Sequence, residues 1–132
     1  MTQFITSVFS KKFIDSLPLE RFPLTHAMCD KNAYETHIPH VLMDLQLRYG
    51  KLMSVVLYTC QWDGVDGIHV YSFEVTADCR LLDYGTRAMN HLKDTTEKIV
   101  LNSLAESKIF YEKMGFLPTS ENGYTWRKND LA

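Results

Sequence analysis

Residues 101–116 read LNSLAESKIFYEKMGF, the most specific pattern in the chain. The apolar run Ile99 to Leu101 predicts a short strand, and Glu106 to Met114 predicts a helix that ends at Gly115. Phe116 to Lys128 follows as a hairpin. The last third of the chain therefore alternates between strands and one helix.

Three runs upstream predict strands: the first and third alternate with the period of a strand, and the second is rich in β-branched and aromatic residues. They are Val41 to Arg48, Leu52 to Trp62 and Ile68 to Thr76. Turns at Tyr49-Gly50-Lys51 and at Asp63 to Gly67 join them, so we expect three consecutive antiparallel strands. A helical reading from Ile38 competes for the first run, but a hairpin explains the first two runs together.

The N-terminal third carries weaker patterns. Gln3 to Phe9 predicts a short first strand. Ser10 to His37 predicts one or two short helices, because Pro18 and Pro23 interrupt the segment. This part contributes to the expected fold without a recognisable motif.

The composition is that of an ordinary globular protein. Of 132 residues, 45% are hydrophobic and 23% are charged, which predicts one domain over residues 1–132. A formal charge of −2 offers no overall field for nucleic acid, and no apolar run approaches the roughly 20 residues that span a bilayer. The three cysteines show no CxxC pairing, which argues against a disulfide framework or a zinc site. We therefore expect a cytoplasmic protein without a nucleic-acid or membrane partner.

Residues 74–86 read EVTADCRLLDYGT and pass from a strand into a helix. The helix has one apolar face, formed by Tyr84, Ala88, Met89 and Leu92. Unpaired N–H groups at the positive end of a helix dipole attract phosphate. Gly85 would let a ligand approach the backbone, Thr86 offers a hydroxyl, and Arg80 or Arg87 supplies positive charge. In the alternative reading Gly85 only eases the turn and Arg80 is a solvated surface residue.

This segment resembles the coenzyme A motif of the GNAT N-acetyltransferases. In that motif an Arg or Gln, two variable residues, a Gly, another variable residue and a Gly or Ala hold the pyrophosphate. Arg80 matches the first position and Gly85 the last, and Val75 stands where the family has a branched apolar residue beside the pantetheine arm. Asp83 departs from the motif, which usually has Gly there. A carboxylate beside a pyrophosphate is unfavourable, so Asp83 must point away, bind another group or weaken the cofactor.

The resemblance implies an α/β (α+β) fold with a GNAT-like, twisted, mostly antiparallel mixed sheet flanked by helices. It implies an opening for acetyl-CoA between the fourth and fifth strands, and direct transfer of the acetyl group to a primary amine of a small molecule or protein, without a metal. The implied coenzyme A contacts are Phe73, Val75, Arg80, Tyr84, Gly85, Thr86, Arg87, Asn102 and Tyr111.

Two other functions stay open. One is a non-catalytic GNAT-like module that binds acyl-CoA or a protein partner, and the other is a structural or interaction module with an empty cleft. An exposed last strand would also allow two copies to pair as a homodimer.

Residues 110–116, FYEKMGF, resemble the family's later signature. In the family the tyrosine of this signature often donates a proton to the leaving thiolate, a role that falls to Tyr111 by position. A phenol is chemically able to act as that acid. The alternative is a core aromatic ring whose hydroxyl reaches water.

Aminolysis of a thioester also needs an unprotonated amine, and His69, Tyr71 and Glu74 are the candidates for its base. We prefer His69, because an ordinary pKa of about 6.5 suits a base near neutrality. Strand alternation predicts that His69 and Glu74 lie on opposite faces, so that at most one of them reaches the cleft. His37 and His40 predict no metal site, because their spacing fits no helix and a third ligand is missing.

Overall fold

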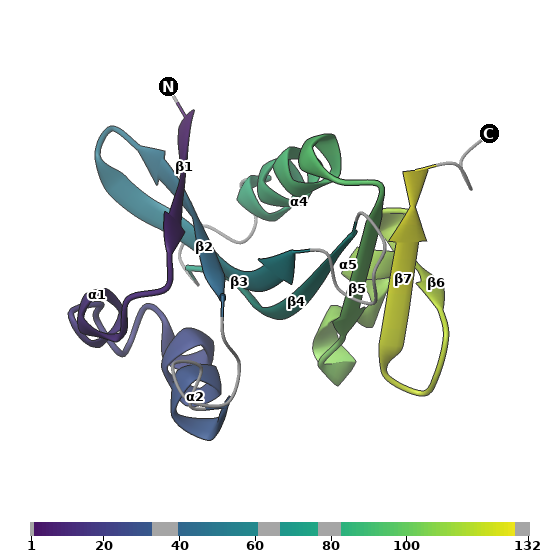
Figure 1. Cartoon of the computed structure of the whole chain (residues 1–132), viewed down its shortest axis with the longest axis horizontal. Helices are drawn as coiled ribbons and strands as arrows, with labels where there is room; N and C mark the ends of the chain where they lie inside the picture. Colours follow the sequence, from purple (N-terminus) through teal and green to yellow (C-terminus); the bar gives the residue numbers. More distant parts are fainter. Residues whose placement is uncertain (1, 33–39, 61–66, 77–82, 129–132) are drawn as a thin grey trace.

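The computed structural model describes residues 2–32, 40–60, 67–76 and 83–128. Within these ranges seven strands form one sheet in the order β1-β2-β3-β4-β5-β7-β6, with helices on both faces (Figure 1). The strands are β1 (Thr2–Val8), β2 (Leu42–Arg48), β3 (Lys51–Cys60), β4 (Gly67–Val75), β5 (Lys98–Asn102), β6 (Leu117–Pro118) and β7 (Gly123–Arg127). The helices are α1 (Lys11–Asp15), α2 (Pro23–Asn32), α4 (Tyr84–Thr95) and α5 (Lys108–Lys113), with a 3-10 turn η3 (Ala105–Ser107).

All neighbouring strands pair antiparallel except β4 and β5, which are parallel. The three consecutive antiparallel strands predicted from the sequence are β2, β3 and β4. Tyr49 and Gly50 form the turn between β2 and β3 with φ values of 52° and 78°. Two adjacent residues in the left-handed region match the twist of a tight hairpin. The predicted fold class is thus confirmed.

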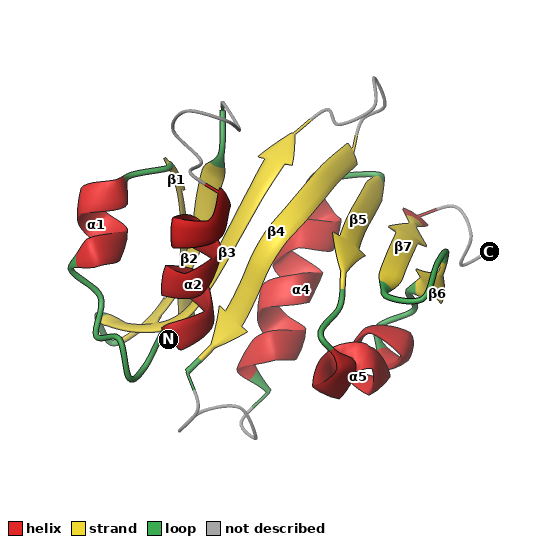
Figure 2. Cartoon of the chain, turned by 90° about the horizontal axis from the view of Figure 1, so that it is seen from below, coloured by secondary structure: helices red, strands yellow, loops and turns green. Residues whose placement is uncertain are grey.

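Two hydrophobic clusters hold the helices against the sheet. Helix α4 covers one face and helices α1 and α2 cover the other (Figure 2). The α4 cluster includes Val56, Tyr58, Ile68, Val70, Met89, Leu92, Ile99, Leu101, Tyr111, Phe116, Tyr124 and Trp126. The α1–α2 cluster includes Ile14, Phe22, Val41, Met43, Leu45, Val55 and Leu57. The four buried residues of α4 are those whose spacing predicted its apolar face.

Strand β4 contains a register shift against β3 that leaves Tyr71 as an extra, bulged residue. His69 and Glu74 pair with Thr59 and Val55, which share one face of β3. The bulge has therefore reversed the alternation of β4 after Tyr71. The prediction that His69 and Glu74 lie on opposite faces is wrong for this reason.

Two smaller differences concern the end of the chain. The predicted helix from Glu106 begins as the η3 turn before α5. The last strand, β7, lies between β5 and β6, so the short strand β6 forms that edge and the expected exposed edge of β7 is wrong. Across the ranges that the structure describes, no helix is both long and apolar enough to cross a membrane.

Candidate active site

The site begins where β4 and β5 part. Their parallel ladder runs from Gly67 with Lys98 to Val70 with Leu101, while β4 continues to Val75. Beyond the last pair the two strands no longer share hydrogen bonds, and two adjoining cavities lie along this part of β4. An opening between the fourth and fifth strands is what the sequence predicted.

The outer cavity has a volume of about 540 Å³, within the range of sites for cofactor-sized ligands. Its walls come from α2, the end of β4, the start of α4, η3 and α5. The lining residues are Pro23, Leu24, Phe73, Glu74, Val75, Gly85, Leu104, Glu106, Ser107, Phe110 and Tyr111. Of the predicted coenzyme A contacts, Phe73, Val75, Gly85 and Tyr111 therefore line this cavity.

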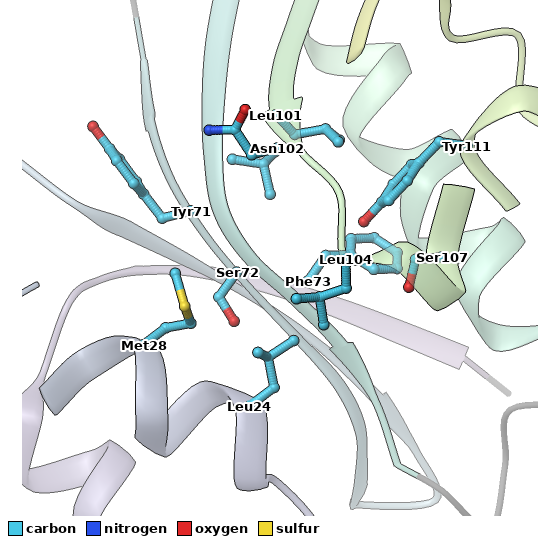
Figure 3. Close-up of a pocket in the computed structure, with 11 residues that line it drawn as sticks. Leu24, Met28, Tyr71, Ser72, Phe73, Leu101, Asn102, Leu104, Ser107 and Tyr111 are labelled. Carbon is cyan, nitrogen blue, oxygen red and sulfur yellow. The ribbon is translucent and has the colours of Figure 1, made fainter. Parts of the chain in front are cut away.

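The inner cavity is smaller, about 70 Å³, and is drawn in Figure 3. Its lining residues are Leu24, Met28, Val70, Tyr71, Ser72, Phe73, Leu101, Asn102, Leu104, Ser107 and Tyr111. Five of these residues also line the outer cavity, so the two spaces adjoin: Leu24, Phe73, Leu104, Ser107 and Tyr111. Asn102, another predicted contact, lies in the inner cavity.

Gly85 lines the outer cavity at the start of α4 and has no side chain between its backbone and the neighbouring residues. A β-carbon built on Gly85 would lie 3.4 Å from the ring of Phe110 and 3.6 Å from a methyl of Val75. The protein alone would tolerate a β-carbon at position 85. A ligand that packs against the backbone of Gly85 would be displaced by it. Together with the helix N-terminus, this geometry fits a phosphate-bearing ligand. Arg80, the predicted cation of the motif, lies outside the described residues.

Asp83 occupies a left-handed conformation, with φ of 71°, immediately before α4. This conformation explains why a glycine suits the position. The side chain makes no capping hydrogen bond to α4 and lies 3.9 Å from Nε of Arg87. Arg87 also donates from Nη1 to the hydroxyl of Thr2 at 3.3 Å. Asp83 thus binds another group, and that group is a predicted ligand of the pyrophosphate.

Tyr84 belongs to the hydrophobic core and lines neither cavity. Its side chain is buried against Met53 and Val75, and its hydroxyl accepts a hydrogen bond from Nη1 of Arg48 at 2.6 Å. The side chains of Tyr84, Thr86 and Arg87, all predicted contacts, are absent from the walls of both cavities.

Tyr111 lies where the two cavities adjoin. Burial raises the pKa of its phenol above the ordinary value, so the hydroxyl stays protonated at neutral pH. The ring packs against Phe110 and Phe116, with centroids 5.3 and 5.5 Å away. Figure 3 shows the hydroxyl end of the ring directed into the inner cavity. A protonated donor therefore stands at the junction.

His69, the preferred base, lines neither cavity. Its ring lies against that of Tyr71, with centroids 4.4 Å apart, and Tyr71 lines the inner cavity. Burial lowers the pKa of His69 below 6.5, which keeps the imidazole neutral at pH 7, as a base requires. His69 is thus separated from the inner cavity by one aromatic ring.

Glu74 caps α2 instead of standing free as a base. Its carboxylate is only 2% exposed and accepts from the backbone N–H groups of Leu24 at 3.0 Å and Thr25 at 2.8 Å. The hydroxyl of Thr25 donates to it as well, at 2.7 Å. Pro23 fills the first position of the helix, where its missing N–H costs no hydrogen bond. These bonds fix Leu24 between the two cavities.

Sequence reasoning missed part of the inner wall. Leu24 and Met28 lie one helical turn apart in α2, and Ser72 follows the bulge in β4. The apolar pair four positions apart, just after Pro23, was the only local signal for the α2 wall. Ser72 carried no such signal.

Within the described ranges, no group of three or more His, Cys, Asp or Glu side chains is arranged to hold a metal ion.

Comparison with known sequences gives limited matches. No family model matches the chain. An uncharacterized N-acetyltransferase from Brevibacillus brevis is 36% identical in an alignment of 69 residues that covers 46% of this chain and 44% of that protein. The match therefore spans less than half of the relative's length.

Solved structures match over nearly the whole chain. The Bacillus subtilis N-acetyltransferase YlbP, in complex with coenzyme A, has a TM-score of 0.63 at 15% identity, over 98% of each chain. Escherichia coli ElaA has a TM-score of 0.65 at 15% identity, over 95% of this chain and 99% of that one. An acetyltransferase of the GNAT family from Staphylococcus aureus Mu50 has a TM-score of 0.63 at 12% identity, over 95% and 99%. At these identities the matches establish a shared fold.

Proposed function

Because the chain has the fold of the GNAT acetyltransferases, we propose that it transfers an acetyl group from acetyl-CoA directly to a primary amine. The observation that carries this proposal is the pair of adjoining cavities opened by the parting of β4 from β5, with Tyr111 at their junction. The outer cavity has the volume for the donor, and the inner cavity adjoins it through shared walls. The N-acetyltransferase relative supports the same reaction class.

The proposed reaction uses Tyr111 and His69. Acetyl-CoA supplies a thioester whose carbonyl carbon forms a bond to the amine nitrogen as its bond to sulfur breaks. The phenol of Tyr111 donates its proton to the departing sulfur, because burial keeps it protonated. His69 is the candidate that takes the proton lost by the amine, and its ring lies against that of Tyr71, which lines the inner cavity. Transfer leaves His69 as an imidazolium and Tyr111 as a phenolate; His69 then releases its proton to solvent and Tyr111 takes one up, which restores both groups for the next turnover.

The donor would be held mainly by backbone groups. Gly85 and the first N–H groups of α4 would bind the pyrophosphate, with Arg80 as its cation, while the unpaired end of β4 at Phe73 and Val75 would run beside the pantetheine arm. Asp83 weakens this arrangement by holding Arg87 and by adding negative charge near the helix start.

A GNAT-like module without turnover is the second candidate, and Asp83 is the observation that favours it. Two assays separate the candidates. Thermal unfolding with and without acetyl-CoA tests donor binding, and release of free thiol in the presence of a broad panel of amines tests transfer. Stabilisation together with amine-dependent thiol release is the expected result. Stabilisation without thiol release would leave a binding module, and the absence of both would end the proposal.

A further inference from the structure

The inner cavity is electrically neutral. Among the residues that the structure describes, its wall contains no Asp, Glu, Lys, Arg or His side chain. The nearest carboxylate on β4, Glu74, lines only the outer cavity and is committed to the N–H groups of Leu24 and Thr25. A second ammonium or a carboxylate on an acceptor would therefore lose hydration here without gaining a charged partner.

Ser72 supplies a polar contact that the fold itself does not use. The residue is 4% exposed, and its hydroxyl finds no hydrogen-bond partner in the described part of the chain. It lines the inner cavity on the segment of β4 that has parted from β5. Figure 3 shows the Ser72 side chain among the lining residues, with Leu24 and Met28 of α2 below it. Buried hydroxyls are normally paired, so a ligand group is the expected partner.

The volume of the inner cavity limits the size of the acceptor group that can enter it. A cavity of about 70 Å³ holds roughly five water-sized spheres, at about 10–15 Å³ for each. That space accommodates the reacting end of an acceptor beside the acetyl group. The apolar stems of Leu24 and Met28 favour hydrocarbon next to the amine.

We propose that the acceptor is a primary monoamine with an uncharged, apolar body, and that its nitrogen is held by Ser72. The amine N–H donates to the Ser72 hydroxyl oxygen, while Leu24 and Met28 contact the carbon chain. A buried site without a countercharge also favours the unprotonated form of an amine, which is the form that attacks. This inference rests on the proposed function for the identity of the site, but it predicts binding independently of turnover.

The test uses three acceptors of matched length: hexylamine, 1,5-diaminopentane and 5-aminopentanoate. Each is titrated by calorimetry into the full chain saturated with coenzyme A, which carries no acetyl group and permits no turnover. Hexylamine should bind at least about tenfold more tightly than the two doubly charged compounds, because each of those brings a second charge to the mouth of a cavity whose wall offers no countercharge. Equal affinity for 1,5-diaminopentane would overturn the inference.

Two pairs of variants make the test specific. Met28→Glu places a carboxylate in the wall and should shift the preference toward 1,5-diaminopentane by about tenfold, while the neutral Met28→Gln should not. Ser72→Ala should weaken hexylamine binding by about three- to tenfold, the range for one lost hydrogen bond, and Ser72→Thr should retain most of it. Unchanged binding in Ser72→Ala, or the same preference in both Met28 variants, would contradict the proposal.

Thiol release from acetyl-CoA with the same three amines tests the acetyltransferase function separately from the monoamine site. Selective binding of hexylamine without thiol release would refute the acetyltransferase function and leave the monoamine site standing. Thiol release with all three acceptors at similar rates would refute the monoamine site and leave the acetyltransferase function standing.

Discussion

Val70 and Leu101 form the last hydrogen-bonded pair of the parallel ladder between β4 and β5, and both side chains line the inner cavity just beyond it. The position of this pair sets where the donor and the acceptor would meet.

Tyr111→Phe should lower kcat by about a hundredfold, the lower range for loss of a general acid, with little change in affinity for coenzyme A. Since burial raises the pKa of Tyr111, kcat of the parent protein should show no alkaline loss from this group up to pH of about 10. Steady-state kinetics across pH measures both effects. Tyr124→Phe is the matched control, because that hydroxyl donates to Glu112 and lines neither cavity.

Asp83→Asn should tighten binding of coenzyme A by about fivefold, because it removes a charge worth ~1 kcal/mol near the helix start and releases Arg87. Asn tolerates the left-handed backbone that Asp83 adopts, so the fold should not change. Asp83→Gly should give a similar gain. Calorimetric titration at low salt checks the effect, and weaker binding in both variants would show that the carboxylate helps to hold the ligand.

Gly85→Ala should leave the free energy of unfolding unchanged or slightly higher, since the added carbon meets Phe110 and Val75 at ordinary contact distances. Binding of coenzyme A should fall by roughly tenfold, because overpacking a tight contact costs ~1–3 kcal/mol. Denaturant unfolding and calorimetry of the same variant separate the two effects. An alanine variant with full affinity would mean that no ligand approaches this part of the backbone.

Glu74→Gln should lower the free energy of unfolding by about 2 kcal/mol, because the amide offers only one acceptor oxygen to the donors that the carboxylate now serves. Thr25→Val removes only the hydroxyl bond and should cost about half as much. Urea denaturation at neutral pH provides the comparison. If the two variants were equally stable, the backbone N–H bonds to Glu74 would contribute little.

His69 should titrate below pH 6.5 in the folded protein. Burial lowers its pKa, so the unfolded chain binds more protons in this window, and stability should fall as pH drops below 6.5. His69→Gln should remove the contribution of His69 to this loss of stability at acidic pH. NMR titration of the imidazole gives the pKa directly, and a value at or above 6.5 would contradict the burial argument.

The parts of the fold that local sequence determines were predicted well. The apolar face of α4, the turn at Tyr49 and Gly50, and the segment around Tyr111 each follow from residues close together in the chain. The motifs of these segments carried the resemblance to the GNAT superfamily, which is confirmed at the level of the fold.

The inner wall was not predictable in the same way. Leu24 lines the site because Glu74, 50 positions later, binds its N–H group, and no local pattern records that bond. The bulge at Tyr71 is set by the pairing of β4 with β3, while the sequence from Ile68 to Thr76 reads as an unbroken alternation. Both features depend on contacts between distant segments.

The cap of α2 has a consequence for the order of folding. Helix α2 precedes β4 in the chain, yet its first N–H groups have their hydrogen-bond acceptor, Glu74, on β4. A contact that closes a long loop forms late, because its entropic cost comes before its gain. We therefore expect α2 to consolidate after the sheet and to open before it. Partial opening would loosen the α2 wall of both cavities while the sheet stays folded, so mild heating should broaden acceptor specificity before the protein unfolds.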